Sequence, residues 1–147
     1  MPTCFIDTNI LLYAKDTSES FKLTIANRWI EALLQKNLAV LSAQSLREYY
    51  SNMLRLDRRA NAVRELRAEM AVLDALVPED LRLDRLAEAW ALQDRYRLSF
   101  WDAMHVASAL AAGCTIFLSE DMNGGQKVDT LTIVNPFTTA PEAVLGA

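Results

Sequence analysis

Apolar and polar positions alternate along this chain with two different periods. Four short apolar runs, each bounded by polar residues, are typical of buried strands and lie at 3–6, 38–42, 115–119 and 130–136. Between them, apolar residues recur at helical spacing, which predicts helices over 9–15, 21–35, 43–56, 59–73 and 81–96. The pattern therefore changes repeatedly between strand and helix.

A further helix is predicted by its two ends. Ser99 and Asp102 fit the Ser-x-x-Asp capping box that opens a helix, and Gly113 is placed to close it. Strands that alternate with helices from end to end predict an α/β fold. We expect a central, mainly parallel sheet of four to five short strands, flanked by helices.

The composition indicates one well-packed domain. The chain has 147 residues, of which 52% are hydrophobic and 23% charged, so it can bury a substantial core. No repeat or linker is evident, and only the tail "TTAPEAVLGA" is a candidate for disorder. The net charge of −4 argues against a protein that simply coats nucleic acid, although arginines gather between 47 and 67.

The two cysteines and the hydropathy indicate the compartment. Cys4 and Cys114 are too few for a disulfide framework, and their apolar surroundings favour buried free thiols in a reducing cytosol. No secretory signal and no membrane-length apolar run is visible. We therefore expect a soluble, cytoplasmic protein that does not associate with a membrane.

Four acidic residues fall at the ends of predicted elements. Asp7 and Asp121 each follow a predicted strand, whereas Glu48 and Asp102 lie near the starts of predicted helices. In a parallel α/β sheet, the carboxyl ends of strands and the starts of helices share one edge, where ligands bind. All four carboxylates can therefore converge at that edge.

A group of acids at one place calls for a cation. Repulsion between carboxylates is relieved by a hard metal ion such as Mg²⁺ or Mn²⁺, which prefers oxygen ligands and can assist phosphodiester chemistry. Each acid also has a simpler interpretation. Asp7 could stabilise the following helix, Asp102 could serve only to cap with Ser99, Glu48 could be solvated, and Asp121 could form a turn.

Four blocks of the sequence, in this order and spacing, carry a family resemblance. "FIDTNILLYA", "LREYY", "LSFWDAMHVASAL" and "FLSEDMNGG" closely resemble PIN-domain ribonucleases, in particular the VapC-type toxins of bacterial toxin–antitoxin systems. The resemblance runs from residue 3 to about 137. It implies a single PIN domain over 1–137, followed by a C-terminal tail at 138–147.

The resemblance also implies an activity, a site and partners. The activity is that of an Mg²⁺- or Mn²⁺-dependent endoribonuclease, acting on an RNA substrate and leaving 5′-phosphate and 3′-hydroxyl ends. The main metal ligands are Asp7 and Asp102, and Glu48 and Asp121 complete the acid set. Polar support comes from Thr8, Asn9 and Ser119. Such toxins usually form homodimers and are inhibited by a cognate antitoxin protein.

Several alternatives stay open beside this interpretation. The chain could be a non-catalytic PIN-like module that binds RNA or protein. A phosphatase of the haloacid-dehalogenase type is disfavoured, because its second acid would stand at Asn9. His105 and the aromatic residues Trp90, Tyr96, Phe100 and Trp101 are expected to pack rather than to act. The arginines Arg47, Arg55, Arg58 and Arg59 could grip RNA phosphates or form a solvated helix face.

Overall fold

A computed structural model describes residues 2–146 and contains one five-stranded sheet. The strands are β1 (Cys4–Ile6), β2 (Ala39–Val40), β3 (Ile116–Leu118), β4 (Lys127–Val128) and β5 (Leu131–Val134). They lie in the order β2-β1-β3-β5-β4, and every neighbouring pair is parallel except the β4–β5 hairpin. The expected α/β fold with a mainly parallel sheet is confirmed.

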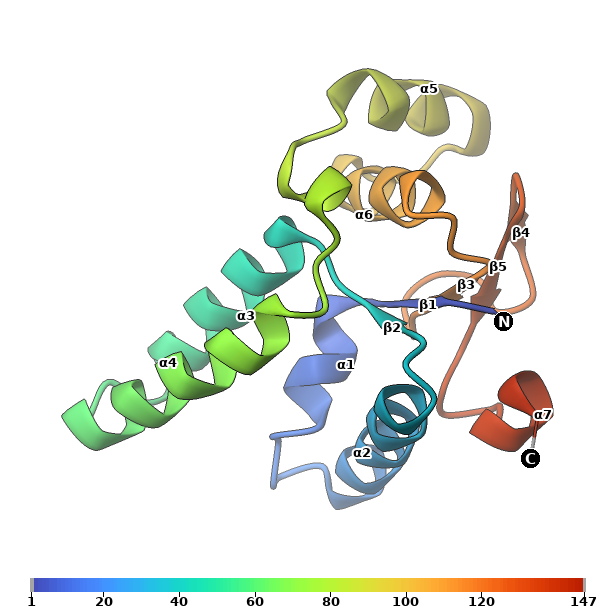
Figure 1. Ribbon diagram of the computed structural model, residues 1–147. Coiled ribbons are helices and arrows are strands. Elements are labelled where there is room, and N and C mark those ends of the chain that lie inside the picture. Colours follow the sequence, from blue (N-terminus) through green and yellow to red (C-terminus); the bar gives the residue numbers. More distant parts are fainter. Residues whose placement is uncertain (1, 147) are drawn as a thin grey trace.

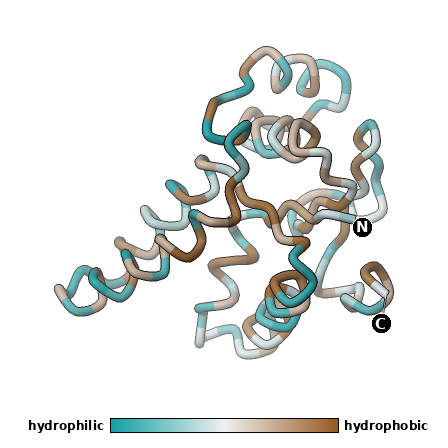
Figure 2. The backbone as a smooth tube through the Cα atoms, in the orientation of Figure 1, coloured by the Kyte–Doolittle hydropathy of each residue, from teal (hydrophilic) through white to brown (hydrophobic). Residues whose placement is uncertain are grey.

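Helices cover both faces of this sheet. The helices are α1 (Thr8–Tyr13), α2 (Ser20–Gln35), α3 (Ala43–Leu56), α4 (Ala60–Asp74), α5 (Leu86–Tyr96), α6 (Phe100–Ala111) and α7 (Pro141–Leu145), with a 3₁₀ turn, η1, at Glu79–Arg82. In Figure 1, α5 and α6 lie on one side of the sheet and α1 and α2 on the other. Helices α3 and α4 pair into an arm that projects away from the sheet, with a mainly hydrophilic tip (Figure 2).

The register between β1 and β3 brings the carboxyl ends of these two strands to the same edge of the sheet. Ile6 of β1 is paired with Leu118 of β3, and the backbone N–H of Asp7 donates to the carbonyl of Leu118 at 3.1 Å. Both strands are buried throughout, because helices cover them on both faces. Phe5 and Phe117 stack across the strands with ring centroids 5.3 Å apart. The residues that follow β1 and β3 therefore emerge side by side.

The chain departs from the sequence-based expectation in three places. The predicted helix over 81–96 is two elements, because Leu81 turns into the core within η1 and the backbone at Leu83 is extended. The short strand β4 was not predicted, since two residues are too few to show an alternating pattern. The strand expected over 130–136 ends at Val134.

The tail is ordered by contacts with α2, which the composition did not predict. The buried indole of Trp29 donates hydrogen bonds to the carbonyl oxygens of Pro136 at 3.1 Å and Thr139 at 3.0 Å. Arg28 pairs with Glu142 at 2.6 Å, and Pro141 stands in the first turn of α7, where proline is well tolerated. The candidate for disorder is therefore a short helix packed against α2.

The state of the two cysteines and the hydropathy of the helices can also be compared with the sequence-based expectations. Cys4 and Cys114 are buried free thiols, as predicted. Burial raises the pKa of Cys114 to about 11 and raises the pKa of Cys4 further still, so both stay protonated. Within residues 2–146, no helix has the length and apolar character needed to cross a membrane.

Candidate active site

Asp7 is delivered to the carboxyl edge of the sheet by β1. It occupies the N-cap position of α1 with an extended backbone, but its side chain makes no capping hydrogen bond. Instead, its Oδ2 accepts a hydrogen bond from the hydroxyl of Ser119 at 3.0 Å, and Ser119 directly follows β3. The Asp7 side chain is only 8% exposed. The helix-stabilising interpretation of Asp7 therefore does not account for its carboxylate.

The electrostatic setting of Asp7 disfavours a negative charge. Burial raises the pKa of Asp7, and the nearby carboxylate of Asp102 raises it further, whereas His105 and Ser119 offset this only in part. Among the described residues, no lysine or arginine forms an ion pair with Asp7 or Asp102. Two neighbouring carboxylates without a cationic side chain fit a bound cation.

Asp102 lies in the first turn of α6. The hydroxyl of Ser99 accepts a hydrogen bond from the backbone N–H of Asp102 at 3.2 Å, which is one half of the predicted capping box. The described hydrogen bonds do not include the return bond from the Ser99 N–H to the Asp102 carboxylate. Capping therefore explains the backbone of Asp102 and leaves its half-buried carboxylate available to a ligand.

Glu48 comes from the middle of α3 and is held from two other helices. Its Oε1 accepts a hydrogen bond from the hydroxyl of Thr8 at 3.0 Å and contacts Nε2 of His105 at 2.6 Å. Burial acts to raise the pKa of Glu48, but the hydrogen bonds and charge of His105, together with Thr8, outweigh it and hold the pKa below its usual value. Glu48 is thus a fixed, half-buried carboxylate and not a solvated one.

Asp121 is the most exposed of the four acids. It lies in the loop after β3, and its Oδ2 accepts a hydrogen bond from the side-chain amide of Asn9 at 2.8 Å. Thr8 and Asn9, the first two residues of α1, therefore hold Glu48 and Asp121 respectively. The start of α1 therefore connects three of the four acids, and the fourth, Asp102, lies near enough for its charge to act on Asp7.

The acids surround this helix start without forming a closed cage. In residues 2–146, no group of three or more His, Cys, Asp or Glu side chains is positioned to hold a metal ion. Mg²⁺ commonly uses only one or two carboxylates and keeps several waters. The donor chemistry of Asp7 and Asp102 fits such a hydrated ion, with Glu48 and Asp121 placed for hydrogen bonds around it.

The predicted arginines are spread along the arm and do not gather beside the acids. Arg47 pairs with Asp84 at 3.7 Å, and Arg59 pairs with Asp57 at 2.7 Å. Arg55 donates a hydrogen bond to the side chain of Asn52. Arg58 and Arg59 lie in the turn between α3 and α4, at the tip of the arm in Figure 1.

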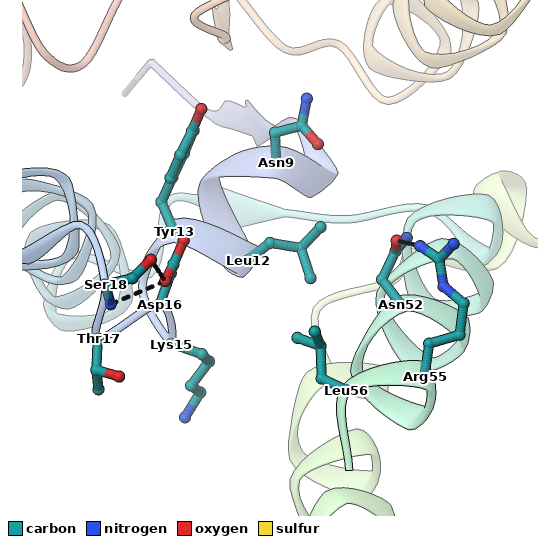
Figure 3. A pocket seen from close by; sticks show the side chains of 10 residues that line it. All are labelled: Asn9, Leu12, Tyr13, Lys15, Asp16, Thr17, Ser18, Asn52, Arg55 and Leu56. Carbon is teal, nitrogen blue, oxygen red and sulfur yellow. Dashed lines mark hydrogen bonds between the residues drawn. The ribbon is translucent and has the colours of Figure 1, made fainter. Parts of the chain in front are cut away.

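Arg55 lies beside a groove of about 800 Å³ next to the acids. The groove runs between α1, the turn that follows it, and the second half of α3, and Figure 3 shows Arg55, Asn52 and Leu56 facing Leu12 across it. Asn9, which holds Asp121, lies at the end of the same groove.

Sequence reasoning missed two side chains around the site. His105 was expected to be a partly buried, hydrogen-bonded helix residue without a role in the site; it is buried and packs against Phe5, and its contact is to one of the four acids, Glu48. Its spacing of one helical turn from Asp102 was the available signal. Glu120, between Ser119 and Asp121, is held by the hydroxyl of Tyr13 at 2.8 Å and by Lys22 at 2.6 Å. Nothing in the spacing connects those three residues.

Comparison with known families agrees with this architecture. The PIN domain model matches residues 4–127, which is most of the chain and includes all four acids, so the chain belongs to the PIN domain family. PIN domains are generally nuclease modules and usually depend on divalent metals such as Mg²⁺. Comparison with curated proteins gives no match.

Proposed function

We propose that this protein is an Mg²⁺- or Mn²⁺-dependent endoribonuclease that hydrolyses phosphodiester bonds in RNA. The observation that carries the proposal is the pairing of Asp7 with Asp102. Burial and the charge of Asp102 act against charge on Asp7, His105 and Ser119 offset this only in part, and no lysine or arginine among the described residues forms an ion pair with Asp7. A protein retains such an arrangement where a cation is to be bound.

Each residue of the candidate active site has its own role in this proposal. Asp7 and Asp102 would hold the metal, which when bound activates water and neutralises charge on the phosphate. Ser119 orients the Asp7 carboxylate through its hydrogen bond. Thr8 and His105 keep Glu48 anionic and aimed at the same edge, and Asn9 orients the carboxylate of Asp121 through its hydrogen bond. No histidine base is required for this chemistry.

The biological role that we propose is that of the toxin in a toxin–antitoxin pair, acting in the cytoplasm. The sequence blocks shared with VapC-type toxins support it. On that basis we also propose a homodimer and a cognate antitoxin protein that occupies the site. A short reading frame just upstream of this gene would favour the proposal that the protein is the toxin of a toxin–antitoxin pair.

One observation favours a second candidate, a non-catalytic PIN-like module that binds RNA or protein. The described acids do not form a ligand group of three or more. If the metal does not bind, the same edge would serve only for recognition.

Mapping of new RNA 5′ ends separates these candidates. Wild type and Asp7→Asn are induced in cells, and Asp94→Asn serves as a matched control, because Asp94 is exposed on α5, away from the acids. The nuclease proposal predicts cut sites in the wild type and in Asp94→Asn that are absent in Asp7→Asn. Cut sites that persist in Asp7→Asn, or none in the wild type, would favour the binding module.

A further inference from the structure

A second hollow, which shares no lining residue with the groove of Figure 3, borders the acid Glu48. It has a volume of about 340 Å³ and lies between the start of α3, the start of α6 and the segment before α5. Glu48 lines it, so the hollow opens directly onto the candidate active site. Its volume falls at the small end of the range for small-ligand sites, roughly 300–1,000 Å³.

The walls of this hollow are apolar and include an exposed tryptophan. Leu86, Phe100, Trp101 and Met104 line it. Trp101 is 62% exposed and packs edge-to-face on Phe100, with ring centroids 5.1 Å apart, so its own ring is held in place while much of it faces solvent. Of the two expected places for Trp101, the core and a dimer interface, its exposure excludes the core. A large aromatic ring left exposed beside Asp102 is available for stacking.

The floor of the hollow contains a polar group without a partner. Gln44 lines the hollow and is 8% exposed, and its Oε1 is buried with no hydrogen bond among the described residues. Its amide nitrogen lies 3.4 Å from Nε2 of His105, which also contacts Glu48. The side chain of Gln44 also hydrogen-bonds the Glu48 carboxylate, which requires its amino group to face Glu48. The oxygen of the Gln44 amide is thus the end left for a ligand.

The rim of the hollow supplies a positive charge that can bind the phosphate of a nucleotide. Arg47 lines the hollow and is itself exposed, with a single long ion pair to Asp84 at 3.7 Å. An exposed pair of this length is weak and can be exchanged for a phosphate. A stacking ring, an unused amide and an exchangeable arginine are the groups that bind a base and its phosphate.

We propose that this hollow binds one unpaired base of the RNA chain, next to the bond that is cut. The ring of Trp101 stacks on the base, the amide of Gln44 hydrogen-bonds its edge, and Arg47 contacts the adjoining phosphate. The proposal rests on the nuclease function and extends it, because it assigns the substrate as single-stranded at this position. It also makes Trp101 and Gln44 determinants of which base stands beside the cut.

The test measures binding separately from cleavage. All variants carry Asp7→Asn so that the RNA stays intact. For the fluorescence measurements Trp90→Phe is added, so that the chain keeps two tryptophans, the exposed Trp101 and the buried Trp29. Short oligo(A), oligo(C) and oligo(U) are titrated while tryptophan emission and fluorescence anisotropy are recorded. We expect quenching of Trp101 at saturation, and a different affinity for each base.

Substitutions then assign the signal to the hollow. Trp101→Ala should weaken binding roughly 5- to 100-fold, the range for loss of one base–aromatic stack, and Trp101→Tyr should restore most of it. Gln44→Met should reduce the difference between bases while quenching persists. Trp90→Ala is the matched control, because Trp90 is exposed on α5 but does not line the hollow, and it should bind like its parent.

Two results would overturn the proposal. One is unchanged RNA affinity in Trp101→Ala. The other is a loss of dimer on size exclusion in Trp101→Ala with RNA affinity intact, which would assign the hollow to contact between two copies. Neither depends on cleavage. Failure of the nuclease function would instead appear as the absence of Asp7-dependent cut sites, whatever Trp101 does.

Discussion

Thr8 and Glu48 are 40 residues apart in the sequence, and a 3.0 Å hydrogen bond joins the hydroxyl of Thr8 to Oε1 of Glu48. The next residue, Asn9, makes the equivalent bond to Asp121 at 2.8 Å. Because Asp7 immediately precedes them, three consecutive residues supply one acid and fix two others. The "DTN" segment is therefore the organising unit of the candidate site.

Replacing Thr8 with valine tests this arrangement. Valine keeps the shape but removes the donor, so Glu48 would be held only by His105 and Gln44. Removing a hydrogen bond to a charged, half-buried group should lower the free energy of unfolding by about 1–2 kcal/mol. We expect RNA cleavage to fall by more than metal affinity does. Urea unfolding and single-turnover cleavage measure the two effects.

Thr8→Ser is the matched control, because serine keeps the hydroxyl. It should retain most of the cleavage rate of the wild type. Equal losses in Thr8→Ser and Thr8→Val would show that the methyl group of Thr8, and not its hydrogen bond to Glu48, is what the site requires.

Asp7→Asn should make the metal-free protein more stable at neutral pH. The pKa of Asp7 is raised in the fold by burial, so its ionised form destabilises the folded state above that pKa. We expect the Tm at pH 7, in EDTA, to rise by about 2–4 °C, the change that roughly 1 kcal/mol produces in a domain of this size. The gain should shrink as the pH falls and Asp7 of the wild type becomes protonated.

Addition of Mg²⁺ should reverse the order of stability. The wild type gains stability by binding the ion in its folded state, by about 2.7 kcal/mol at a metal concentration of 100 times Kd. Asp7→Asn lacks one of the two ligands and should gain little. Equal stabilisation of both proteins by Mg²⁺ in a thermal scan would remove Asp7 from the metal site.

The sequence was sufficient to place Asp7 and Asp121, because each follows a buried apolar run and parallel strands end at a common edge. The length of α3 was also predicted, since its apolar face is strongly periodic. The contact between His105 and Glu48 was not predictable. It depends on how α6 packs against α3, and side-chain contacts between helices leave no mark in either pattern.

The same limit applies to the elements that were missed. The β4 strand exists because the chain reverses at Asp129, which adopts a left-handed backbone with φ of 53°. The tail helix exists because α2 offers the indole of Trp29 to the carbonyl oxygens that precede it. For the tail helix the deciding partner is distant in the sequence, whereas for β4 it is the neighbouring strand β5, and the two-residue length of β4 hides the pattern.

Glu120 should stabilise the loop that carries Asp121. Burial acts to raise its pKa, but Lys22 and Tyr13 hold the pKa below its usual value. Tyr13→Phe removes one bond and should lower the free energy of unfolding by about 0.5–1.5 kcal/mol. Lys22→Met should destabilise the protein at pH 7, and the difference from the wild type should disappear as Glu120 becomes protonated in acid. Urea unfolding measured over a series of pH values follows both effects.

Lys127→Met is the control for the positive charge that Lys22→Met removes, because Lys127 is exposed on β4 and forms none of the described ion pairs. It should not reproduce the acid-dependent difference. A Lys22→Met difference that is the same at every pH would mean that Lys22 acts by packing over the rings of Tyr13 and Phe137, and not through Glu120.

Neutralising the arginines of the arm tests whether it contacts RNA. Arg55, Arg58 and Arg59 changed together to glutamine should weaken binding of single-stranded RNA and flatten its dependence on salt. Every arginine that neutralises a phosphate in the complex should add about 0.7 to the slope of log K against log salt, and its replacement should remove that amount. Arg95→Gln is the control, because Arg95 pairs with Asp129 at 3.2 Å, away from the arm. An unchanged slope in the triple variant would assign these arginines to a solvated helix face, and Lys15 would then be the remaining basic residue of the groove of Figure 3.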